Sequence, residues 1–267
     1  MKIYLSADIE GVTGVTHWHE TNMEKPDSGE FREQMTAEVL AACEGALQAG
    51  ATEILVKDAH DTARNILAAK LPQEVRLVRG WSGHPLTMMQ ELDETFAGVI
   101  MIGYHSRAGG AGNPLSHTLT GSVVYIKMNG RYASEFLINT YAAAMFNVPV
   151  VFVSGDQGVC DDAVALNPHI GVAAVKTGIG NSTVSIHPAL AVTRIREGVA
   201  AALKDDPALF RLSLSTRFSV EIQYKNHFDA YKASFYPGAS LTAPDTVHFE
   251  AQDYFEVLRL FLFTTWI

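Results

Sequence analysis

Long apolar segments alternate with segments whose apolar residues recur at helical spacing, and this alternation constrains the fold most strongly. The apolar segments are KIYLSAD (2–8), TEILVKD (52–58), AGVIMIGY (97–104) and PVVFVSG (149–155). Strands that are apolar along their whole length are typical of parallel sheets, because helices cover both faces of such sheets. We therefore predict an α/β fold, with a mostly parallel sheet that is covered by helices on both faces.

The segments between these strands predict helices. At 31–49, apolar residues recur at helical spacing and Gly50 follows as a C-terminal cap. Further helices are expected at 62–70, 85–93 and 135–147, and from Pro188 onward, since proline suits a first helical position. Two weaker strands are expected at 74–80 and 171–175.

The last quarter of the chain has a different pattern. RFSVEIQY (217–224) alternates like a half-exposed strand, a helix is expected at 226–234, and TVHFEA (246–251) precedes a final helix. We expect residues 1–205 to form an α/β metal-binding catalytic domain and residues 206–267 to form a small α+β subdomain. Within the larger part, Asn129-Gly130 is a strong signal for a two-residue hairpin turn.

Composition excludes several classes of function. The net charge of −9 leaves no basic surface for nucleic acid, and the apolar runs are much shorter than a membrane span. No secretory signal pattern precedes the first strand. Only Cys43 and Cys160 are present, and Cys43 lies on an apolar helix stripe, which favours a buried thiol over a disulfide. We expect a soluble, cytoplasmic protein.

Acidic and histidine residues follow the ends of the predicted strands. Asp8 and Glu10 come after the first strand, His60 after the second, and His105 after AGVIMIGY. Glu135 begins the helix that follows the hairpin. Ligands of open parallel sheets gather at the carboxyl ends of the strands. We therefore expect three carboxylates and two imidazoles to converge at one edge of the sheet.

Such a cluster needs a compensating positive charge, because buried carboxylates repel each other and lose their hydration. Carboxylate and imidazole ligands without thiolate indicate a catalytic zinc site, with manganese and cobalt as alternatives. Five ligands exceed the need of one tetrahedral ion, so two bridged ions use them better. Asp8 is the candidate bridge, because its short side chain is held close to the strand.

Each of these residues also has an ordinary structural role. An acid at a strand end commonly caps a helix, and Glu135 could simply stabilise the first turn of its own helix. It is their joint placement that favours a metal site. His117, at the end of GGAGNPLSH (109–117), is not needed as a ligand. Asp156 also ends a strand, where it could cap a helix or support the ligands.

Several motifs resemble a known family, the zinc-dependent D-aminopeptidases encoded in bacterial dipeptide-transport operons. SADIEG (6–11) matches the S-x-D-x-E-G signature of that family. Other motifs appear in the order and spacing of the family, namely KDAH (57–60), GYHSRAG (103–109), LSHT (115–118) and NGRYASEFLIN (129–139). The similarity extends from Met1 to the final helix.

The resemblance implies two zinc ions in each subunit, with Asp8 as the bridge. It implies that the other ligands divide into Glu10 and His60 on one ion, and His105 and Glu135 on the other. His117 corresponds to a catalytic histidine that does not bind metal. The resemblance also implies release of amino-terminal D-residues from short peptides, inside a homodecamer that encloses the active sites.

Two alternatives to this function remain open at the level of sequence. A dinuclear centre could serve an amidase or a phosphoesterase, although no cluster of arginine or lysine accompanies the candidate ligands beyond Arg107. The protein could instead be a non-catalytic ring protein that binds peptides, in which case no acid or base residue such as His117 would be needed beside the metal ligands. The sequence also leaves open whether His117 acts as an acid, an oxyanion stabiliser or a nucleophile.

Overall fold

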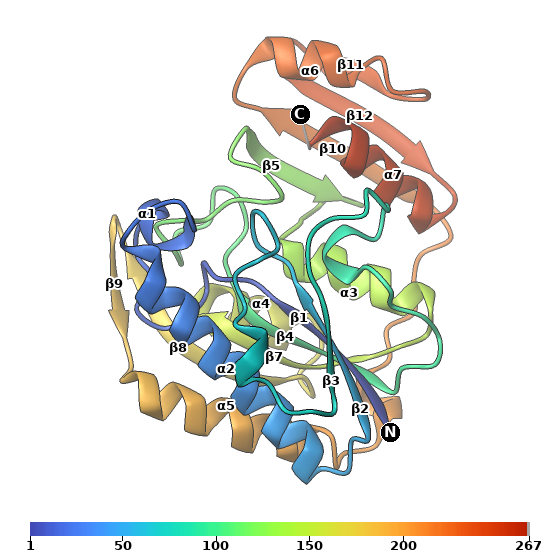
Figure 1. The fold of residues 1–267 in the computed structure, drawn as a ribbon. Coiled ribbons are helices and arrows are strands. Elements are labelled where there is room, and N and C mark those ends of the chain that lie inside the picture. Colours follow the sequence, from blue (N-terminus) through green and yellow to red (C-terminus); the bar gives the residue numbers. More distant parts are fainter. Residues whose placement is uncertain (266–267) are drawn as a thin grey trace.

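A computed structural model describes residues 1–265 and shows two β-sheets. The larger sheet has seven strands in the order β3-β2-β1-β4-β7-β8-β9 (Figure 1). In chain order these are β1 (Lys2–Ala7), β2 (Glu53–Asp58), β3 (Val75–Val78), β4 (Gly98–Tyr104), β7 (Val150–Asp156), β8 (Gly171–Ile179) and β9 (Ser182–Ser185). All neighbouring pairs are parallel except β8 and β9. The predicted mostly parallel sheet is confirmed.

Helices cover both faces of this sheet, as predicted. On one face, α2 (Ser28–Gln48) and α5 (Pro188–Ala202) pack against each other (Figure 1). On the other face lie α3 (Glu135–Met145) and α4 (Gln157–Leu166). A hydrogen-bonded chain ties the sheet to α3, because the Ser6 hydroxyl lies 2.7 Å from the Tyr104 hydroxyl, which accepts from the Asn139 amide.

The smaller sheet is antiparallel and has the order β11-β12-β10-β5-β6. Its strands are β5 (Val123–Met128), β6 (Arg131–Tyr132), β10 (Phe218–Tyr224), β11 (Ser240–Ala243) and β12 (Thr246–Ala251), with α6 (His227–Ala233) and α7 (Tyr254–Thr264) packed on it. Asn129 and Gly130 both have positive φ between β5 and β6, which confirms the hairpin turn. Because β5 pairs with β10, this sheet contains strands from both sides of residue 206. A division of the chain at that residue stays a prediction.

The short helices predicted at 62–70 and 85–93 are wrong. Only single 3₁₀ turns form there, η1 (Ala68–Lys70) and η2 (Thr87–Met89). In the first segment, the Asp58 carboxylate accepts hydrogen bonds from the backbone amides of Asn65 and Ile66, at 2.5 and 2.8 Å. These amides are therefore engaged by a side chain from β2. Outside these segments, two further short elements are α1 (Trp18–Thr21) and η3 (Pro207–Phe210).

Both cysteines are buried and free, Cys43 in α2 and Cys160 in α4, as the apolar position of Cys43 predicts. The core lies on both faces of the larger sheet and continues under the smaller one. Among residues 1–265, no helix has both the length and the apolar character needed to cross a membrane.

Candidate metal centre

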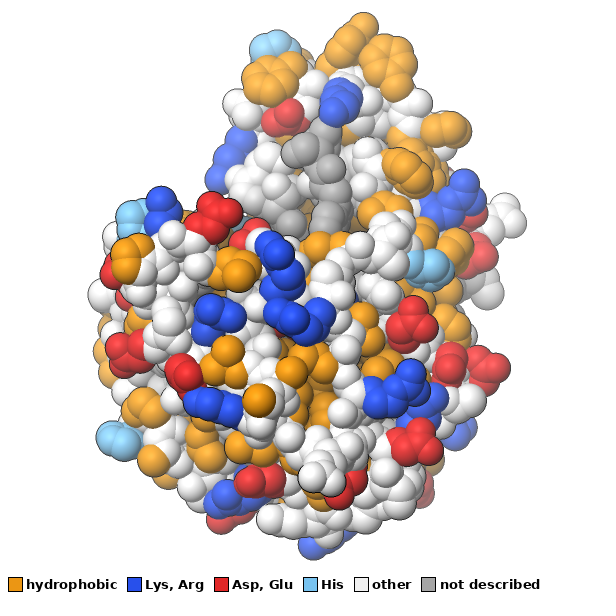
Figure 2. All heavy atoms as spheres, viewed as in Figure 1, with side chains coloured by type: hydrophobic (Ala, Val, Ile, Leu, Met, Phe, Trp, Pro, Cys, Tyr) orange, Lys and Arg blue, Asp and Glu red, His pale blue; other side chains and the backbone are white. Residues whose placement is uncertain are grey.

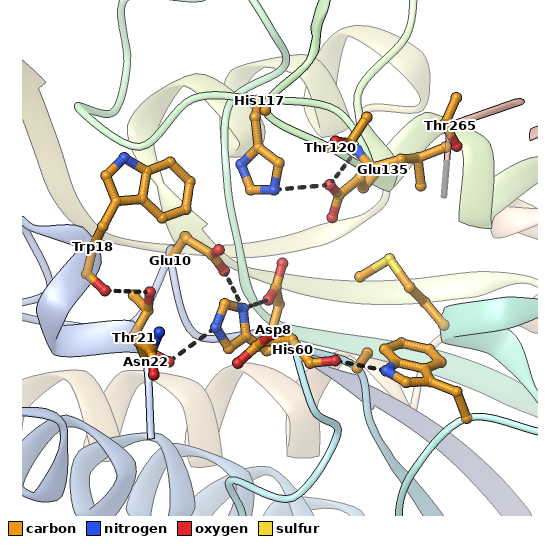
Figure 3. Close-up of a pocket in the computed structure, with 16 residues that line it drawn as sticks. Asp8, Glu10, Trp18, Thr21, Asn22, His60, His117, Thr120, Glu135 and Thr265 are labelled. Atoms are coloured by element: carbon orange, nitrogen blue, oxygen red, sulfur yellow. Dashed lines mark hydrogen bonds and ion pairs between the residues drawn. The ribbon is translucent and has the colours of Figure 1, made fainter. Parts of the chain in front are cut away.

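The five predicted ligands lie together at the carboxyl ends of three adjacent strands, β2, β1 and β4. Figure 3 shows four of them, Asp8, Glu10, His60 and Glu135. Asp8 and Glu10 follow β1, His60 follows β2, and His105 follows β4, while Glu135 is the first residue of α3. Each is at most 8% exposed. The sequence therefore predicted the convergence of these side chains correctly.

Glycines allow the loop after β1 to lie directly against the end of β4. The Gly11 amide donates to the Gly103 carbonyl at 2.8 Å. A Cβ on Gly103, whose φ is +70°, would lie only 2.2 Å from the Asp8 carbonyl oxygen. Glycine is thus required at 103 by its backbone conformation and by this close approach. The contact fixes Asp8 beside His105.

His60 is oriented by a backbone carbonyl. Its Nε2 lies 3.0 Å from the carbonyl oxygen of Thr21 and donates its proton there. The Nδ1 atom faces two carboxylates, with Glu10 Oε2 at 2.9 Å and Asp8 Oδ1 at 3.3 Å. A histidine whose second nitrogen is held in this way is typical of metal sites.

His105 has the same arrangement with the two ring nitrogens exchanged. Its Nδ1 lies 2.9 Å from the Ser106 carbonyl oxygen and donates to it. Its Nε2 faces Asp8 Oδ2 at 3.5 Å and Glu135 Oε2 at 3.6 Å. Each imidazole therefore directs its second nitrogen at two carboxylates. Although burial opposes it, these carboxylates raise the pKa of both rings, to about 10 for His105, so without a cation each ring carries a proton on this nitrogen. A bound cation would take the place of these protons.

Two of these atoms are buried without a hydrogen-bond partner in the described part of the chain, namely Glu10 Oε2 and His105 Nε2. Buried polar atoms are nearly always satisfied. A cation between them would satisfy both. The residues present therefore fit a metal centre.

The donor atoms form overlapping groups of three, each with its atoms within 4.8 Å of one another. One group is Asp8, Glu10 and His60, and another is Asp8, His105 and Glu135. Asp8 belongs to both, and its two carboxylate oxygens face different histidines. A third group consists of Glu10, His105 and His117, so geometry alone also leaves a ligand role open to His117.

The carboxylates of Asp8 and Glu10 differ in their electrostatics. Burial and the neighbouring Glu10 carboxylate raise the pKa of Asp8 well above its usual value. Burial acts in the same direction on Glu10, but the neighbouring histidines, His60 foremost, together outweigh burial and hold the pKa of Glu10 well below its usual value. Without a cation, the cluster therefore cannot easily keep Asp8 charged.

His117 lies beside this cluster and is more open, with 15% of its side chain exposed. Its Nδ1 donates to the Leu115 carbonyl at 2.9 Å, and its Nε2 lies 3.5 Å from Glu135 Oε1. The Trp18 ring meets it edge-on, with centroids 5.3 Å apart. The free Nε2 can accept a proton from a group in the cavity.

Asp156, at the end of β7, supports the centre from behind. Its carboxylate accepts from the Ser106 amide at 2.7 Å and from the Asn113 side-chain amide at 3.0 Å. Asn113 also donates to the Glu10 carbonyl at 2.8 Å. The same carboxylate caps α4 by accepting from the Val159 amide. Both roles considered from sequence are therefore present together.

The cluster opens into a cavity of about 450 Å³. Its walls include residues that the sequence did not indicate, namely Trp18, Trp81 and Met88, and Thr265 from the end of α7. The one available signal was a tryptophan in a glycine-containing loop, GWSG at 80–83. None of the described residues that line the cavity is a lysine or an arginine.

The family model for D-aminopeptidase matches residues 1–263. The chain belongs to the D-aminopeptidase family. A D-aminopeptidase of Bacillus subtilis (strain 168) is 33% identical over 267 residues, which cover 99% of this chain and 97% of the relative.

A solved structure shares both the fold and the family. It is described as the Zn-dependent D-aminopeptidase DppA from Bacillus subtilis, a self-compartmentalizing protease. The TM-score is 0.94 at 32% identity, and the match covers 99% of this chain and 97% of that one. The family resemblance seen in the sequence motifs is confirmed, and with it the α/β fold.

Proposed function

We propose that this member of the D-aminopeptidase family is a zinc-dependent aminopeptidase that releases an amino-terminal D-residue from short peptides. The observation that carries the proposal is the pair of donor groups that share Asp8, with unpaired buried donor atoms directed between them. The centre lies in a cavity of about 450 Å³, which has room for a short peptide.

Two zinc ions per subunit account for the donor set. Glu10 and His60 would hold one ion, His105 and Glu135 the other, and Asp8 would bridge them through its two oxygens. When bound, such a pair of ions supplies the Lewis acidity that activates water and polarises an amide carbonyl. The buried carboxylates provide the negative charge that keeps divalent cations in place.

His117 is the proposed catalytic residue. Because its Nδ1 proton is held by the Leu115 carbonyl, its Nε2 enters the reaction as a proton acceptor. It can then take a proton from the attacking water and return it to the departing amine nitrogen. The contact with Glu135 at 3.5 Å stabilises the protonated ring in between.

The cavity disfavours the phosphoesterase alternative. Phosphate groups are usually bound by arginine or lysine, and the described cavity lining has neither. Arg107 instead has its guanidinium 4.2 Å from the Tyr132 ring centroid. The peptide-binding alternative, without catalysis, leaves the orientation of His117 toward the cavity unexplained.

We also propose that the protein works in the cytoplasm as a closed homo-oligomer, a decamer by family resemblance. The self-compartmentalizing relative supports assembly. Aromatic side chains on α6, α7 and the turn after α6 support it as well, since Phe228, Phe235 and Phe263 are 60%, 70% and 65% exposed. Figure 2 shows hydrophobic side chains gathered over the upper part of the molecule, where Figure 1 places α6. Two free, buried cysteines are consistent with a reducing compartment.

The test is hydrolysis of matched D- and L-dipeptides by protein that has been stripped of metal and then reconstituted with zinc. We expect release of the amino-terminal D-residue only after zinc is added, with the L-peptides cleaved far more slowly. p-Nitrophenyl phosphate serves as the control substrate for the alternative chemistry. Tight peptide binding without cleavage, or cleavage of the phosphate ester alone, would contradict the proposal.

A further inference from the structure

Lys176 is a charged residue in the interior of the larger sheet, with 3% of its surface exposed. It lies on β8, where it pairs with Asp156 of β7. Its ammonium donates to two backbone carbonyls, that of Glu10 and, at 2.6 Å, that of Val15. Burying a charge is costly unless polar groups engage it. Lys176 therefore holds both ends of the segment 10–15, which follows β1.

The order of the strands shows how far the loop after β1 extends. β4 and β7 lie between β1 and β8, so the loop crosses the carboxyl ends of two strands before it reaches Lys176. The contact joins residues that are 166 positions apart in the chain. On the way, the Gly11 amide donates to the Gly103 carbonyl of β4. The loop is thus fixed at β4 and again at β8.

The first of the two carbonyls belongs to a proposed metal ligand. The Glu10 carbonyl accepts from Lys176 and also from the Asn113 side-chain amide, at 2.8 Å. Two donors on one carbonyl fix the backbone from which the Glu10 side chain extends toward His60. Lys176 therefore acts on this ligand through its backbone.

The second carbonyl precedes the short helix α1, whose N-cap is His17. The Glu20 carboxylate accepts from the amides of Thr16 and His17, at 2.6 and 2.9 Å, and so ties the start of α1 to its end. α1 ends at Thr21, whose carbonyl oxygen orients His60 (Figure 3). The position of the second carbonyl thus influences the orientation of another proposed ligand.

The ligands of the other proposed ion are held by different contacts. His105 donates to the Ser106 carbonyl at 2.9 Å, and Glu135 accepts from the Leu119 amide at 2.7 Å. Neither contact involves the segment 10–21. The loop after β1 therefore supports the two proposed metal positions unequally.

We propose that Lys176 is the positioning residue for one of the two metal ions, namely the ion that Glu10 and His60 would hold. This inference rests on the two-ion centre of the proposed function. Removal of the lysine loosens both ligands that belong to this ion alone. The lysine charge acts in the opposite direction, because an ammonium repels a divalent cation. A loss of zinc affinity on its removal is therefore the signature of positioning.

The experiment compares wild type, Lys176→Met and Lys57→Met by calorimetric titration of the metal-free proteins with zinc near neutral pH. Methionine keeps the length of the lysine side chain. We expect Lys176→Met to bind one ion as wild type does and the other about 10–100-fold more weakly, the usual effect of losing a residue that supports a metal ligand. In crystals at limiting zinc, the anomalous peak beside His60 should weaken, and the peak beside His105 should remain.

Lys57 is the matched control, because it is a second buried lysine of the same sheet, on β2. It is 0% exposed and its ammonium donates to the Gly80 carbonyl at 2.5 Å. Burial lowers the pKa of both lysines to about 8. Lys57→Met should keep both zinc affinities. A selective loss beside His60 in this control as well would overturn the inference. So would affinities in Lys176→Met that are unchanged, raised, or lowered equally at both positions.

A second variant keeps the test decisive if Lys176→Met does not fold. Glu20→Ala removes the carboxylate that ties α1 together and leaves the contact between Lys176 and Glu10 in place. It should weaken the ion beside His60 by a smaller factor and leave the ion beside His105 unchanged. In that case, no change or an equal weakening of both ions would overturn the inference.

These measurements separate the inference from the proposed function, because zinc is titrated without a peptide. Two ions in wild type, with no selective loss in Lys176→Met, would reject the inference alone. Selective loss without any hydrolysis of D-peptides would reject the proposed activity and support the role of Lys176. A single ion in wild type would reject the two-ion centre and this inference together.

Discussion

The imidazole rings of His105 and His117 stack face to face, with centroids 4.4 Å apart and planes 16° from parallel. Burial and the neighbouring His105 lower the pKa of His117. Two positive rings at this separation would repel each other, so His117 is kept neutral beside a histidine that faces the metal centre. The stacking thus favours a role for His117 in proton transfer.

His117→Ala should keep its zinc and lose about 10²–10⁴-fold in kcat, the usual contribution of a general acid or base. Zinc content and turnover of a D-alanyl peptide would be measured on the same sample. His169→Ala, at an exposed site, is the control and should match wild type. Loss of zinc from His117→Ala would instead show that His117 is a metal ligand. A near-normal turnover rate would contradict its proposed role in proton transfer.

Asp8 is the side chain that the two proposed metal positions share, through Oδ1 toward His60 and Oδ2 toward His105. We expect Asp8→Ala to bind almost no zinc, because both positions lose a carboxylate. Glu135→Ala removes a ligand from one position and should retain about half of the wild-type zinc. Metal analysis after gel filtration gives both values. Full zinc content in Asp8→Ala would refute the bridge.

Asp156 should affect metal affinity through the loops that it holds. Asp156→Ala removes the acceptor for Ser106 and Asn113, which position His105 and the Glu10 backbone. Zinc affinity should fall about 10–100-fold, as is usual when outer partners of metal ligands are removed. Competition with a chelator measures the affinity.

Because Asp156 also caps α4, its substitution should cost about 1 kcal/mol of stability as well. Asp253→Ala is the matched control, since Asp253 caps α7 by accepting from the Phe255 amide at 2.8 Å. It should lose a similar amount of stability and keep its zinc affinity. If the two variants bound zinc with equal affinity, Asp156 would act only as a helix cap.

Lys57 should make stability depend on pH in the alkaline range. Burial lowers its pKa from 10.5 to about 8 in the folded protein. Between these values the unfolded chain binds more protons, so folding becomes more favourable as pH rises. Relative to Lys57→Met, wild type should gain about 2–3 kcal/mol between pH 8 and 10.5, since one pKa unit corresponds to about 1.4 kcal/mol.

Urea unfolding of wild type and Lys57→Met at both ends of this range measures the effect, and other titrating groups cancel in the comparison. Well below pH 8 the difference between the two proteins should be constant, because Lys57 is then protonated in both states. A difference that stays flat up to pH 10.5, or falls, would contradict the lowered pKa.

The sequence predicted the convergence at the candidate site well, because the placement of these residues follows from the parallel sheet alone. Asp8, His60 and His105 each come directly after or close to a strand end, and adjacent strands bring such positions together. The hydrogen bonds that orient the rings were not accessible in this way. The Thr21 carbonyl that holds His60 lies at the end of the short helix α1, in a segment whose sequence shows no regular pattern.

The fold was less predictable where distant contacts override local preference. The segment 85–93 reads as a helix, but Tyr4 donates to the Gln90 carbonyl at 2.8 Å, and Thr87 adopts a φ of +43°. Side chains of β1 thus engage the backbone of this segment. The pairing of β5 with β10 spans more than 90 residues, and no local pattern in either strand specifies the other. The helix α4 and the edge strands β9 and β11 were also not predicted.

Crystals of the zinc-reconstituted protein, with anomalous diffraction recorded at the zinc absorption edge, test the central claim most directly. We expect two strong peaks on either side of the Asp8 carboxylate, one beside His60 and the other beside His105. A single peak, peaks at other residues, or no peak next to Asp8 would contradict it.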